Sequence, residues 1–310
     1  MMTRGFLQRY LINCQTFYRF VIDMNKLIIY AINGLLTWCL NFIYRKMILY
    51  DGTPPEHLKN RIPVMNDKPI VINTTLKWGE TDSQLIQQTL LSYTSVDATI
   101  FVFLITDNSN PFFVPDNVRF YRTSLLKSKQ VTNEFLLPFI WECQDAPFSP
   151  LPKVDKPIVG FCGLISQPRI NTLRAIHACS QITSNFIIRD QFWGGRPHAP
   201  DLVNDFLENI RTSNFTVCNR GAGNFSMRFY QTMACGRIPV LVNTDMVFPF
   251  ADEIDWSSII VVADSEEQLV DKIVNCWNTR DIVAMQLKCR EIFDCYFAGT
   301  KFFDRILQIS

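Results

Sequence analysis

Residues 219–231 read Asn-Arg-Gly-Ala-Gly-Asn-Phe-Ser-Met-Arg-Phe-Tyr-Gln and place a glycine-rich turn directly before a helical segment. The first turn of a helix exposes unpaired N–H groups, and the peptide dipoles put partial positive charge there. Glycines let the backbone approach an anionic ligand without a Cβ in the way. Ser226 and Arg228 add a hydroxyl donor and a fixed cation suited to phosphate oxygens. The stretch therefore predicts a diphosphate-binding turn.

The flanking residues place this turn inside a strand–helix–strand unit. Residues 206–210 have helical spacing, and residues 214–218 (Asn-Phe-Thr-Val-Cys) have the pattern of a short buried strand. After the turn we expect a helix that has Ser226 and Arg228 in its first turn and continues over residues 229–235, where Gly236 ends it, and then a strand over residues 238–242. Ligands of such right-handed units lie at the carboxyl ends of the strands, which is where the turn lies.

A simpler interpretation of the turn is a tight bend with a helix cap. For a lone Gly-x-Gly pattern this is the more common outcome. Arg220, Ser226 and Arg228 are hard to explain by a cap alone, so the diphosphate site is the interpretation that we follow.

A longer ordered string resembles the exostosin-like glycosyltransferases (glycosyltransferase family 47). The resemblance is good over residues 133–262 and poor elsewhere. It rests on residues 133–142 (Asn-Glu-Phe-Leu-Leu-Pro-Phe-Ile-Trp-Glu), 159–163 (Val-Gly-Phe-Cys-Gly) with Arg169, 220–231, 234–240 (Ala-Cys-Gly-Arg-Ile-Pro-Val), 248–250 (Phe-Pro-Phe) and 254–256 (Ile-Asp-Trp). It implies a GT-B fold, in which two Rossmann-like domains face a cleft and the C-terminal one holds a nucleotide sugar. It also implies inversion at the anomeric carbon and no catalytic metal.

The donor site expected from the residues and the resemblance is built mostly from the turn and its helix. Arginines and a helix N-terminus can neutralise a leaving diphosphate without a metal. For Arg169 an ordinary surface arginine is an equally good interpretation, and for Asp245 a turn-capping aspartate is the alternative. The expected donor-binding residues are Arg169, Arg220, Gly221, Gly223, Asn224, Ser226, Arg228, Gln231 and Asp245.

Gln231 departs from the resemblance, because the family usually has glutamate there, similar to the ribose-binding carboxylate of other GT-B enzymes. A carboxylate accepts two hydroxyl hydrogen bonds with charge assistance, whereas an amide accepts with one oxygen. Two functions therefore stay open. One is an inverting, metal-independent transfer from a UDP-sugar to a glycan, glycoprotein or glycolipid acceptor, and the other is a catalytically degenerate protein that binds nucleotide or glycan or scaffolds a partner.

The catalytic base is expected in the N-terminal half, at the carboxyl end of a strand. Glu80 and Asp82 follow the first strand, Asp107 follows the second, and Glu142 lies in the family-like stretch. Each of them is individually more often a loop cap or a solvated charge. We rank Glu80 first, with Asp107 as the next candidate, and count Arg228 with them as a catalytic residue.

The chain is expected to be an α/β protein of two domains after an apolar N-terminal segment. Its 310 residues suffice for two cores. We expect a segment and linker over residues 1–68, a short acceptor-side Rossmann-like domain over 69–150 and a nucleotide-sugar-binding domain over 151–310. Strands are predicted at 69–73, 99–105, 118–121 and 158–162 and a helix at 83–93. Either the first domain is a trimmed unit or residues before 69 complete it.

Residues 27–44 are a mostly apolar run between basic residues, near the lower length limit of a membrane span. The alternative is a pair of amphipathic helices packed on the catalytic body. A Golgi-type type II anchor and a cytoplasmic location both stay open. Sequons at Asn73, Asn214 and Asn224 make a lumenal location awkward, because the last lies inside the diphosphate turn.

Composition excludes several other classes. A net charge of +1 gives no field for nucleic acid. Ten cysteines without Cys-x-x-Cys pairs indicate buried thiols, and three scattered histidines do not suggest a zinc site. No early Gly-x-Gly-x-x-Gly supports a sugar-nucleotide epimerase or dehydrogenase. We therefore expect no cofactor besides the donor substrate and no bound metal, and the sequence does not identify the donor sugar.

Overall fold

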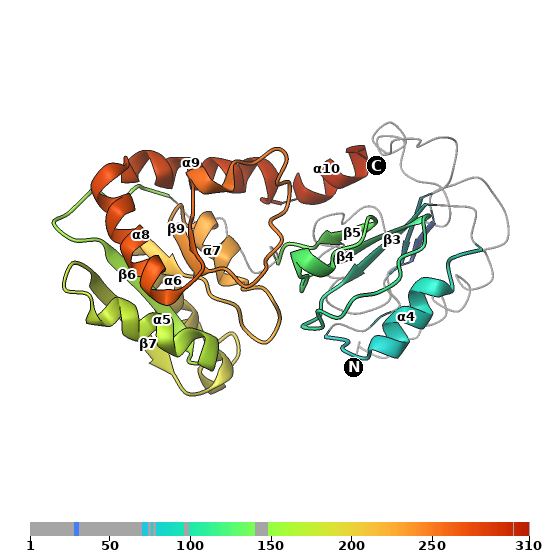
Figure 1. The fold of residues 1–310 in the computed structure, drawn as a ribbon, viewed down its shortest axis with the longest axis horizontal. Coiled ribbons are helices and arrows are strands. Elements are labelled where there is room, and N and C mark those ends of the chain that lie inside the picture. The colour runs from blue at the N-terminus through green and yellow to red at the C-terminus, as the bar shows by residue number, and fades with distance from the viewer. Residues whose placement is uncertain are drawn as a thin grey trace, which may run out of the picture.

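A computed structural model describes residues 28–30, 70–73, 76, 79–95, 99–139, 148–299 and 301–309. The described chain contains two five-stranded parallel sheets, one in each half (Figure 1). Strand order is β1-β2-β3-β4-β5 in the first sheet and β10-β9-β8-β6-β7 in the second. An α/β fold with two parallel sheets was expected, and it is what the structure has.

The first sheet consists of β1 (Ile28–Tyr30), β2 (Ile70–Asn73), β3 (Thr99–Leu104), β4 (Val118–Arg122) and β5 (Glu134–Leu136). Helix α4 (Ser83–Leu91) is capped by Asp82, whose carboxylate accepts hydrogen bonds from the amides of Gln84 and Leu85. Residues before 69 do contribute to this sheet, because β1 pairs in parallel with β2. The rest of the apolar run 27–44 lies outside the described residues, so its function as an anchor stays a prediction.

Strand β3 is buried on both faces, as expected of a central parallel strand. Side chains alternate across a strand, so Ile100, Val102 and Leu104 pack with α4 residues such as Ile86 and Leu90. Phe101 and Phe103 point to the opposite face and join the main core of the molecule.

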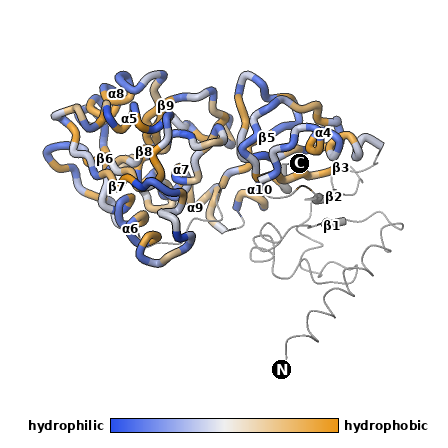
Figure 2. The backbone as a smooth tube through the Cα atoms, turned by 90° about the horizontal axis from the view of Figure 1, so that it is seen from below, coloured by the Kyte–Doolittle hydropathy of each residue, from blue (hydrophilic) through white to orange (hydrophobic). Residues whose placement is uncertain are grey.

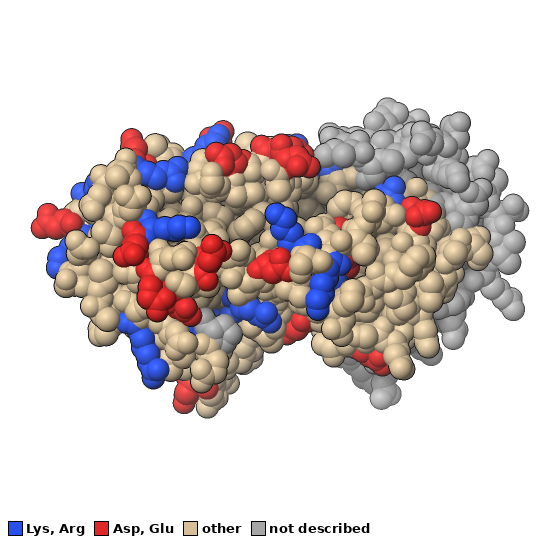
Figure 3. Space-filling model, viewed as in Figure 1, with Lys and Arg blue, Asp and Glu red and all other residues tan. Residues whose placement is uncertain are grey.

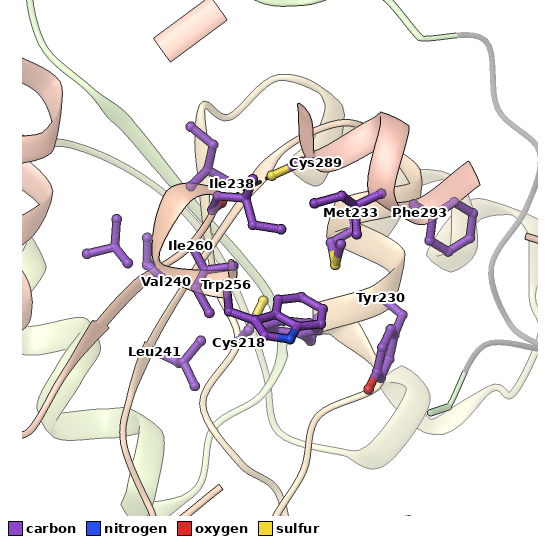
Figure 4. Packing of buried hydrophobic residues seen from close by; sticks show 14 of the residues in the cluster. Cys218, Tyr230, Met233, Ile238, Val240, Leu241, Trp256, Ile260, Cys289 and Phe293 are labelled. Carbon is purple, nitrogen blue, oxygen red and sulfur yellow. Dashed lines mark hydrogen bonds between the residues drawn. The ribbon is translucent and has the colours of Figure 1, made fainter. Parts of the chain in front are cut away.

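The second sheet consists of β6 (Ile158–Leu164), β7 (Thr183–Arg189), β8 (Phe215–Val217), β9 (Ile238–Val242) and β10 (Val261–Ala263). Its helices are α5 (Gln167–Ala178), α6 (Pro200–Arg211), α7 (Arg228–Ala234), α8 (Glu266–Thr279) and α9 (Ile282–Tyr296). Residues of α7, β9 and α9, among them Met233, Ile238 and Phe293, point toward one another in the core (Figure 4). Strand β8, helix α7 and strand β9 form the strand–helix–strand unit that was predicted around the glycine turn.

The C-terminal helix α10 (Lys301–Ile309) follows the second sheet in sequence but packs on the first (Figures 1 and 2). Phe303 meets Phe103 of β3 edge-on at 5.5 Å, and Phe302 meets Tyr121 of β4 at 6.1 Å. Phe302 also contacts Phe250 of the second half at 5.7 Å. The helix therefore joins both halves into one hydrophobic core.

Several other sequence predictions are confirmed within the described part of the chain. Helix α7 ends at Gly236, which has φ +60° and donates its N–H to the Met233 carbonyl. All seven described cysteines are free, and five are buried. Burial raises the pKa of the Cys218 thiol to about 11.

None of the described helices has the length and apolarity that a bilayer crossing requires.

Two of the three sequons lie in places where the folded protein is inaccessible. Asn214 is 1% exposed and Asn224 is 2% exposed. The side chains of both are engaged in hydrogen bonds inside the fold. A glycan on either amide is incompatible with this packing.

Glu142, a candidate for the catalytic base, lies outside the described residues.

Candidate functional site

The second sheet has the strand order of an open doubly wound sheet, with a switch point between β6 and β8. Chain order runs outward from β6 to β7 on one side and from β8 to β9 and β10 on the other. In such sheets ligands bind outside the carboxyl ends of the strands at the switch point. Arg228 lies there, because it donates to the carbonyl of Cys162 at 2.8 Å and to that of Val217 at 3.4 Å. One arginine thus holds the ends of both switch-point strands.

The Arg228 guanidinium is buried without a negative partner in the part of the chain that the structure describes. The residue is 7% exposed, and its Nε lacks a hydrogen-bond partner. Its guanidinium carbon lies 4.4 Å from the centre of the Phe161 ring. Burial, together with the positive charge of Arg169, lowers the pKa of Arg228 to about 10, so the side chain remains charged at neutral pH. No described carboxylate forms an ion pair with it. A buried cation with a free N–H group is suited to binding an anion.

Arg169 brings a second cation to the same place. It lies in the first turn of α5, which follows β6, and its Nη1 donates to the Leu164 carbonyl at 3.0 Å. Its buried Nε also has no hydrogen-bond partner. A Cβ built on Gly221 would lie 3.3 Å from Arg169 Nη2, so this guanidinium is beside the glycine turn. Burial lowers the pKa of Arg169 as well. The structure brings together Arg169, Arg228 and Gly221, as expected.

The turn itself is held from several sides. Asn219 accepts from the Val242 amide at 2.9 Å and donates to Thr172 at 2.7 Å, which fixes the exit of β8. The Gly221 amide donates to the Phe225 carbonyl, so one N–H of the turn is already in use. Arg220 folds over its own loop and donates to the Ala222 carbonyl at 2.7 Å. Its charge therefore faces the turn rather than the Arg228 side chain.

Helix α7 begins later than the sequence suggested, with Arg228 as its first residue. Ser226 is 6% exposed and precedes the helix. Gln231 is 7% exposed, and its Oε1 is buried without a hydrogen-bond partner. Gln231 follows Arg228 by three residues, and residues so spaced share a helix face. An unpartnered amide oxygen thus lies on the same face of α7 as the unpartnered guanidinium nitrogen.

Asn224 forms hydrogen bonds with both halves of the molecule. Its backbone N–H donates to Ser124 Oγ at 2.8 Å, and its Nδ2 donates to the Leu125 carbonyl at 3.0 Å. Its Oδ1 accepts from Thr244 Oγ1 at 2.6 Å. The side chain that we expected at the donor is in this structure committed to the contact between the two halves.

Asp245 likewise bridges the two halves. Its carboxylate accepts from the Ser128 amide at 3.0 Å and from the Ser128 hydroxyl at 2.5 Å, and its carbonyl accepts from the Lys127 amide at 2.9 Å. These bonds with Ser128 lower the pKa of Asp245. The residue has φ +62°, a conformation that aspartate tolerates better than most residues. This geometry matches the turn-capping alternative.

The two candidate bases of the first half have different surroundings. Glu80 Oε1 accepts hydrogen bonds from the amides of Thr81 and Asp82, both at 2.9 Å, so it caps its own turn. Asp107 lies against the glycine turn, because a Cβ built on Gly223 would come 2.6 Å from Asp107 Oδ1. Asp107 is exposed and forms no hydrogen bond or ion pair with the rest of the described chain.

Ser124 and Ser128 are the site-adjacent residues that the sequence did not reveal. They lie about a hundred residues before their partners Asn224 and Asp245, in a stretch without a motif. The signal that could have revealed Ser124 is its position just after a predicted strand, β4, where hydroxyl side chains can reach a site. Groups of three or more metal-ligating side chains do not occur among the described residues.

Comparison with known proteins identifies the region that contains this site. Residues 165–275 match the family model of the Exostosin GT47 domain. An exostosin-1 homologue of Caenorhabditis elegans is 27% identical over 107 residues, which are 34% of this chain and 28% of that protein. A probable glucuronosyltransferase of Oryza sativa subsp. japonica is 34% identical over 82 residues, covering 26% and 19% of the two chains. A probable beta-1,4-xylosyltransferase of Arabidopsis thaliana is 32% identical over 87 residues, covering 28% and 21%.

Among solved structures, TarM aligns with 82% of this chain and 56% of its own, at 12% identity and a TM-score of 0.43. The matched segments span less than a third of each curated relative quoted above. The resemblance to exostosin-like glycosyltransferases is confirmed for residues 165–275, and the stretch before residue 165 lies outside the match. The matched residues include Arg169, Arg228, Gln231 and Asp245.

Proposed function

We propose that this chain transfers a sugar from a nucleoside-diphosphate sugar, with UDP as the nucleotide, to a hydroxyl of a glycan, glycoprotein or glycolipid. The observation that carries the proposal is the buried, unpaired charge of Arg228 at the switch point of the second sheet, with Arg169 beside it. A match to a glycosyltransferase domain over the same residues supports it. A diphosphate is the group that such a pair of arginines suits best.

The two arginines supply what departure of the diphosphate requires. Negative charge grows on the leaving oxygen as the bond to the sugar breaks. Fixed cations in a water-poor site stabilise that charge without reorganising. Arg228 is held by two backbone carbonyls and Arg169 by one, so both guanidinium groups are positioned before substrate arrives. On this proposal the protein needs no metal for the leaving group, the anomeric carbon inverts, and the two sheets act as the halves of a GT-B enzyme.

Gln231 takes the place of a ribose-binding carboxylate in this proposal. Its buried Oε1 is free to accept one hydroxyl hydrogen bond. One neutral acceptor in place of a charged one weakens nucleotide binding by about 1 kcal/mol. We therefore expect a nucleotide affinity about fivefold lower than a glutamate would give, with the diphosphate providing most of the binding.

A calorimetric titration of the full-length protein tests the proposal. UDP and inorganic pyrophosphate are expected to bind, whereas uridine, which lacks the diphosphate, is expected to bind at least tenfold more weakly. UDP release from UDP-glucuronate, UDP-xylose, UDP-galactose and UDP-arabinose then tests turnover; the first two come first because relatives are named for these sugars. Equal binding of UDP and uridine would remove the basis of the proposal. Binding without release of UDP from any donor would leave a nucleotide-binding protein rather than a transferase.

A further inference from the structure

We propose that Asp107 is the general base that takes the proton from the acceptor hydroxyl. This assignment rests on the proposed transferase function and adds the residue that activates the acceptor. Its basis is a close approach between the two halves: the carboxylate of Asp107, from the first half, lies directly against Gly223 of the glycine turn.

The backbone around Asp107 is fixed on both sides, so its Cα has a defined place. Before it, the Thr106 hydroxyl donates to the Glu80 carbonyl and the Thr106 amide donates to Thr123 Oγ1 at 2.9 Å. After it, the Asn108 amide donates to Thr106 Oγ1 at 3.0 Å. Asp107 therefore stands at the carboxyl end of β3, where the sheet presents its functional side chains.

The glycine turn connects this carboxylate to the arginine pair. Arg169 lies beside Gly221, and Asp107 lies beside Gly223. Two residues of chain span at most about 7 Å, so the carboxylate and the cation flank one short piece of backbone. A displacement reaction needs this arrangement, because the proton acceptor serves the incoming oxygen and the cations serve the departing one, on opposite sides of the anomeric carbon.

The absence of a side chain at Gly223 is what lets Asp107 approach. A Cβ there would lie 2.6 Å from Asp107 Oδ1, which is closer than real contacts allow, and 3.1 Å from its Cα, which is a tight contact. Ser124 Oγ, at 3.2 Å from the same point, closes the remaining side. A side chain at 223 would therefore force the Asp107 carboxylate to move away from the turn.

The neighbouring carboxylates are already engaged. Glu80 and Asp82 cap backbone amides of their own segment, and Asp245 binds Ser128. The Asp107 carboxylate makes no hydrogen bond within the described part of the chain and is exposed, so it is available to an acceptor hydroxyl. Among the described carboxylates that lie next to the glycine turn or at the ends of β2 and β3, Asp107 is the free one.

The reaction step balances without a further reagent. The acceptor oxygen forms a bond to the anomeric carbon while its proton passes to an Asp107 carboxylate oxygen. The bond between the anomeric carbon and the diphosphate oxygen breaks, and its electron pair leaves with UDP. Water can take the place of the acceptor, in which case the products are free sugar and UDP.

The test compares Asp107→Asn with Asp116→Asn in the full-length protein. Asp116 is also exposed but precedes β4, at the opposite end of the sheet. UDP release from UDP-glucuronate or UDP-xylose is expected to fall at least ~100-fold in Asp107→Asn and to stay unchanged in Asp116→Asn, since a general base contributes ~10²–10⁴-fold. The calorimetric affinity for UDP is expected to stay the same in both variants.

An experiment with sodium azide distinguishes a catalytic base from a side chain with only a structural role. Azide attacks the anomeric carbon without losing a proton, so it needs no base. With Asp107→Ala, azide is expected to restore UDP release and to yield a glycosyl azide. Gly223→Ala, which displaces the carboxylate, is expected to reduce turnover while UDP still binds.

Two failures are distinguishable. Wild-type protein that does not bind UDP, or releases it from no donor, overturns the proposed function and this assignment with it. Wild-type protein that turns over normally, alongside an Asp107→Asn variant of equal rate or an Asp107→Ala variant that azide does not rescue, overturns the assignment of Asp107 alone.

Discussion

Arg228 and Arg169 differ in how much of the fold depends on them. Arg228 is 7% exposed and binds the carbonyls of Cys162 and Val217, so its replacement removes structure as well as charge. Arg169 is half-buried and binds one carbonyl, that of Leu164. Arg169 is therefore the better position for testing the charge alone.

Arg169→Gln is expected to weaken UDP binding by ~10- to 100-fold, because a hydrogen bond to a charged group contributes about 1.5–3 kcal/mol. The matched control is Arg174→Gln, an exposed arginine further along α5. Calorimetric titration with UDP measures both. An equal affinity in the two variants would mean that Arg169 does not face the diphosphate, which is the surface-arginine interpretation.

At the scale of elements, the glycine turn is both a loop of the second sheet and a contact to the first. The amide of Gly221 closes the turn on Phe225, while the amide of Asn224 reaches Ser124. An antiparallel bridge between Leu126 and Met246 lies next to these bonds. The turn is therefore hydrogen-bonded to both halves of the molecule.

Asn224→Asp is expected to lower the free energy of unfolding by about 1–3 kcal/mol, because a carboxylate cannot donate to the buried carbonyl of Leu125. Urea denaturation followed by circular dichroism measures the loss. Asn171→Asp, at an exposed position of α5, should leave stability unchanged. An Asn224→Asp variant of wild-type stability but weakened UDP binding would instead return Asn224 to the donor site.

The elements of the second sheet were predictable because local patterns define them. The strands at 158–162 and 238–242 and the helix ended by Gly236 were found within a few residues. The start of α7 was missed, since Ser226 and Met227 have no periodicity that separates turn from helix. The partners of Asn224 could not be found, because no local pattern links a serine and an asparagine a hundred residues apart.

At the scale of the whole molecule, helix α10 returns from the second half to the sheet of the first half. Helix α10 buries Phe302 and Phe303, at 1% and 3% exposure, between the two sheets. Lysine, arginine and acidic side chains are interspersed over the face in Figure 3, which shows no extended field of one sign. The two halves are thus joined by an apolar helix and by the polar contacts of Asn224 and Asp245.

Phe302→Ala is expected to destabilise the protein by about 3–5 kcal/mol, because it removes a buried ring that contacts both Tyr121 and Phe250. Lys301→Ala, one residue earlier and exposed, is the matched control. Thermal unfolding should show a clearly lower transition temperature for Phe302→Ala and an unchanged transition temperature for Lys301→Ala. Identical transitions would mean that α10 does not hold the halves together.

The contact between the two halves shows what could not be predicted from the sequence. Buried strands and the α/β class follow from apolar runs such as residues 99–105. The use of residues 28–30 as an edge strand and the return of α10 depend on contacts between distant segments. The donor candidates Arg169 and Arg228 converged as expected, whereas Glu80 became a cap because a backbone turn offered it two amides.

A crystal structure of the full-length protein with UDP tests the central claim most directly. The account predicts diphosphate oxygens within hydrogen-bonding distance of Arg169 and Arg228 at the carboxyl ends of β6 and β8, with their free Nε groups engaged. A structure in which UDP lies elsewhere while both Nε groups keep their present surroundings would contradict it.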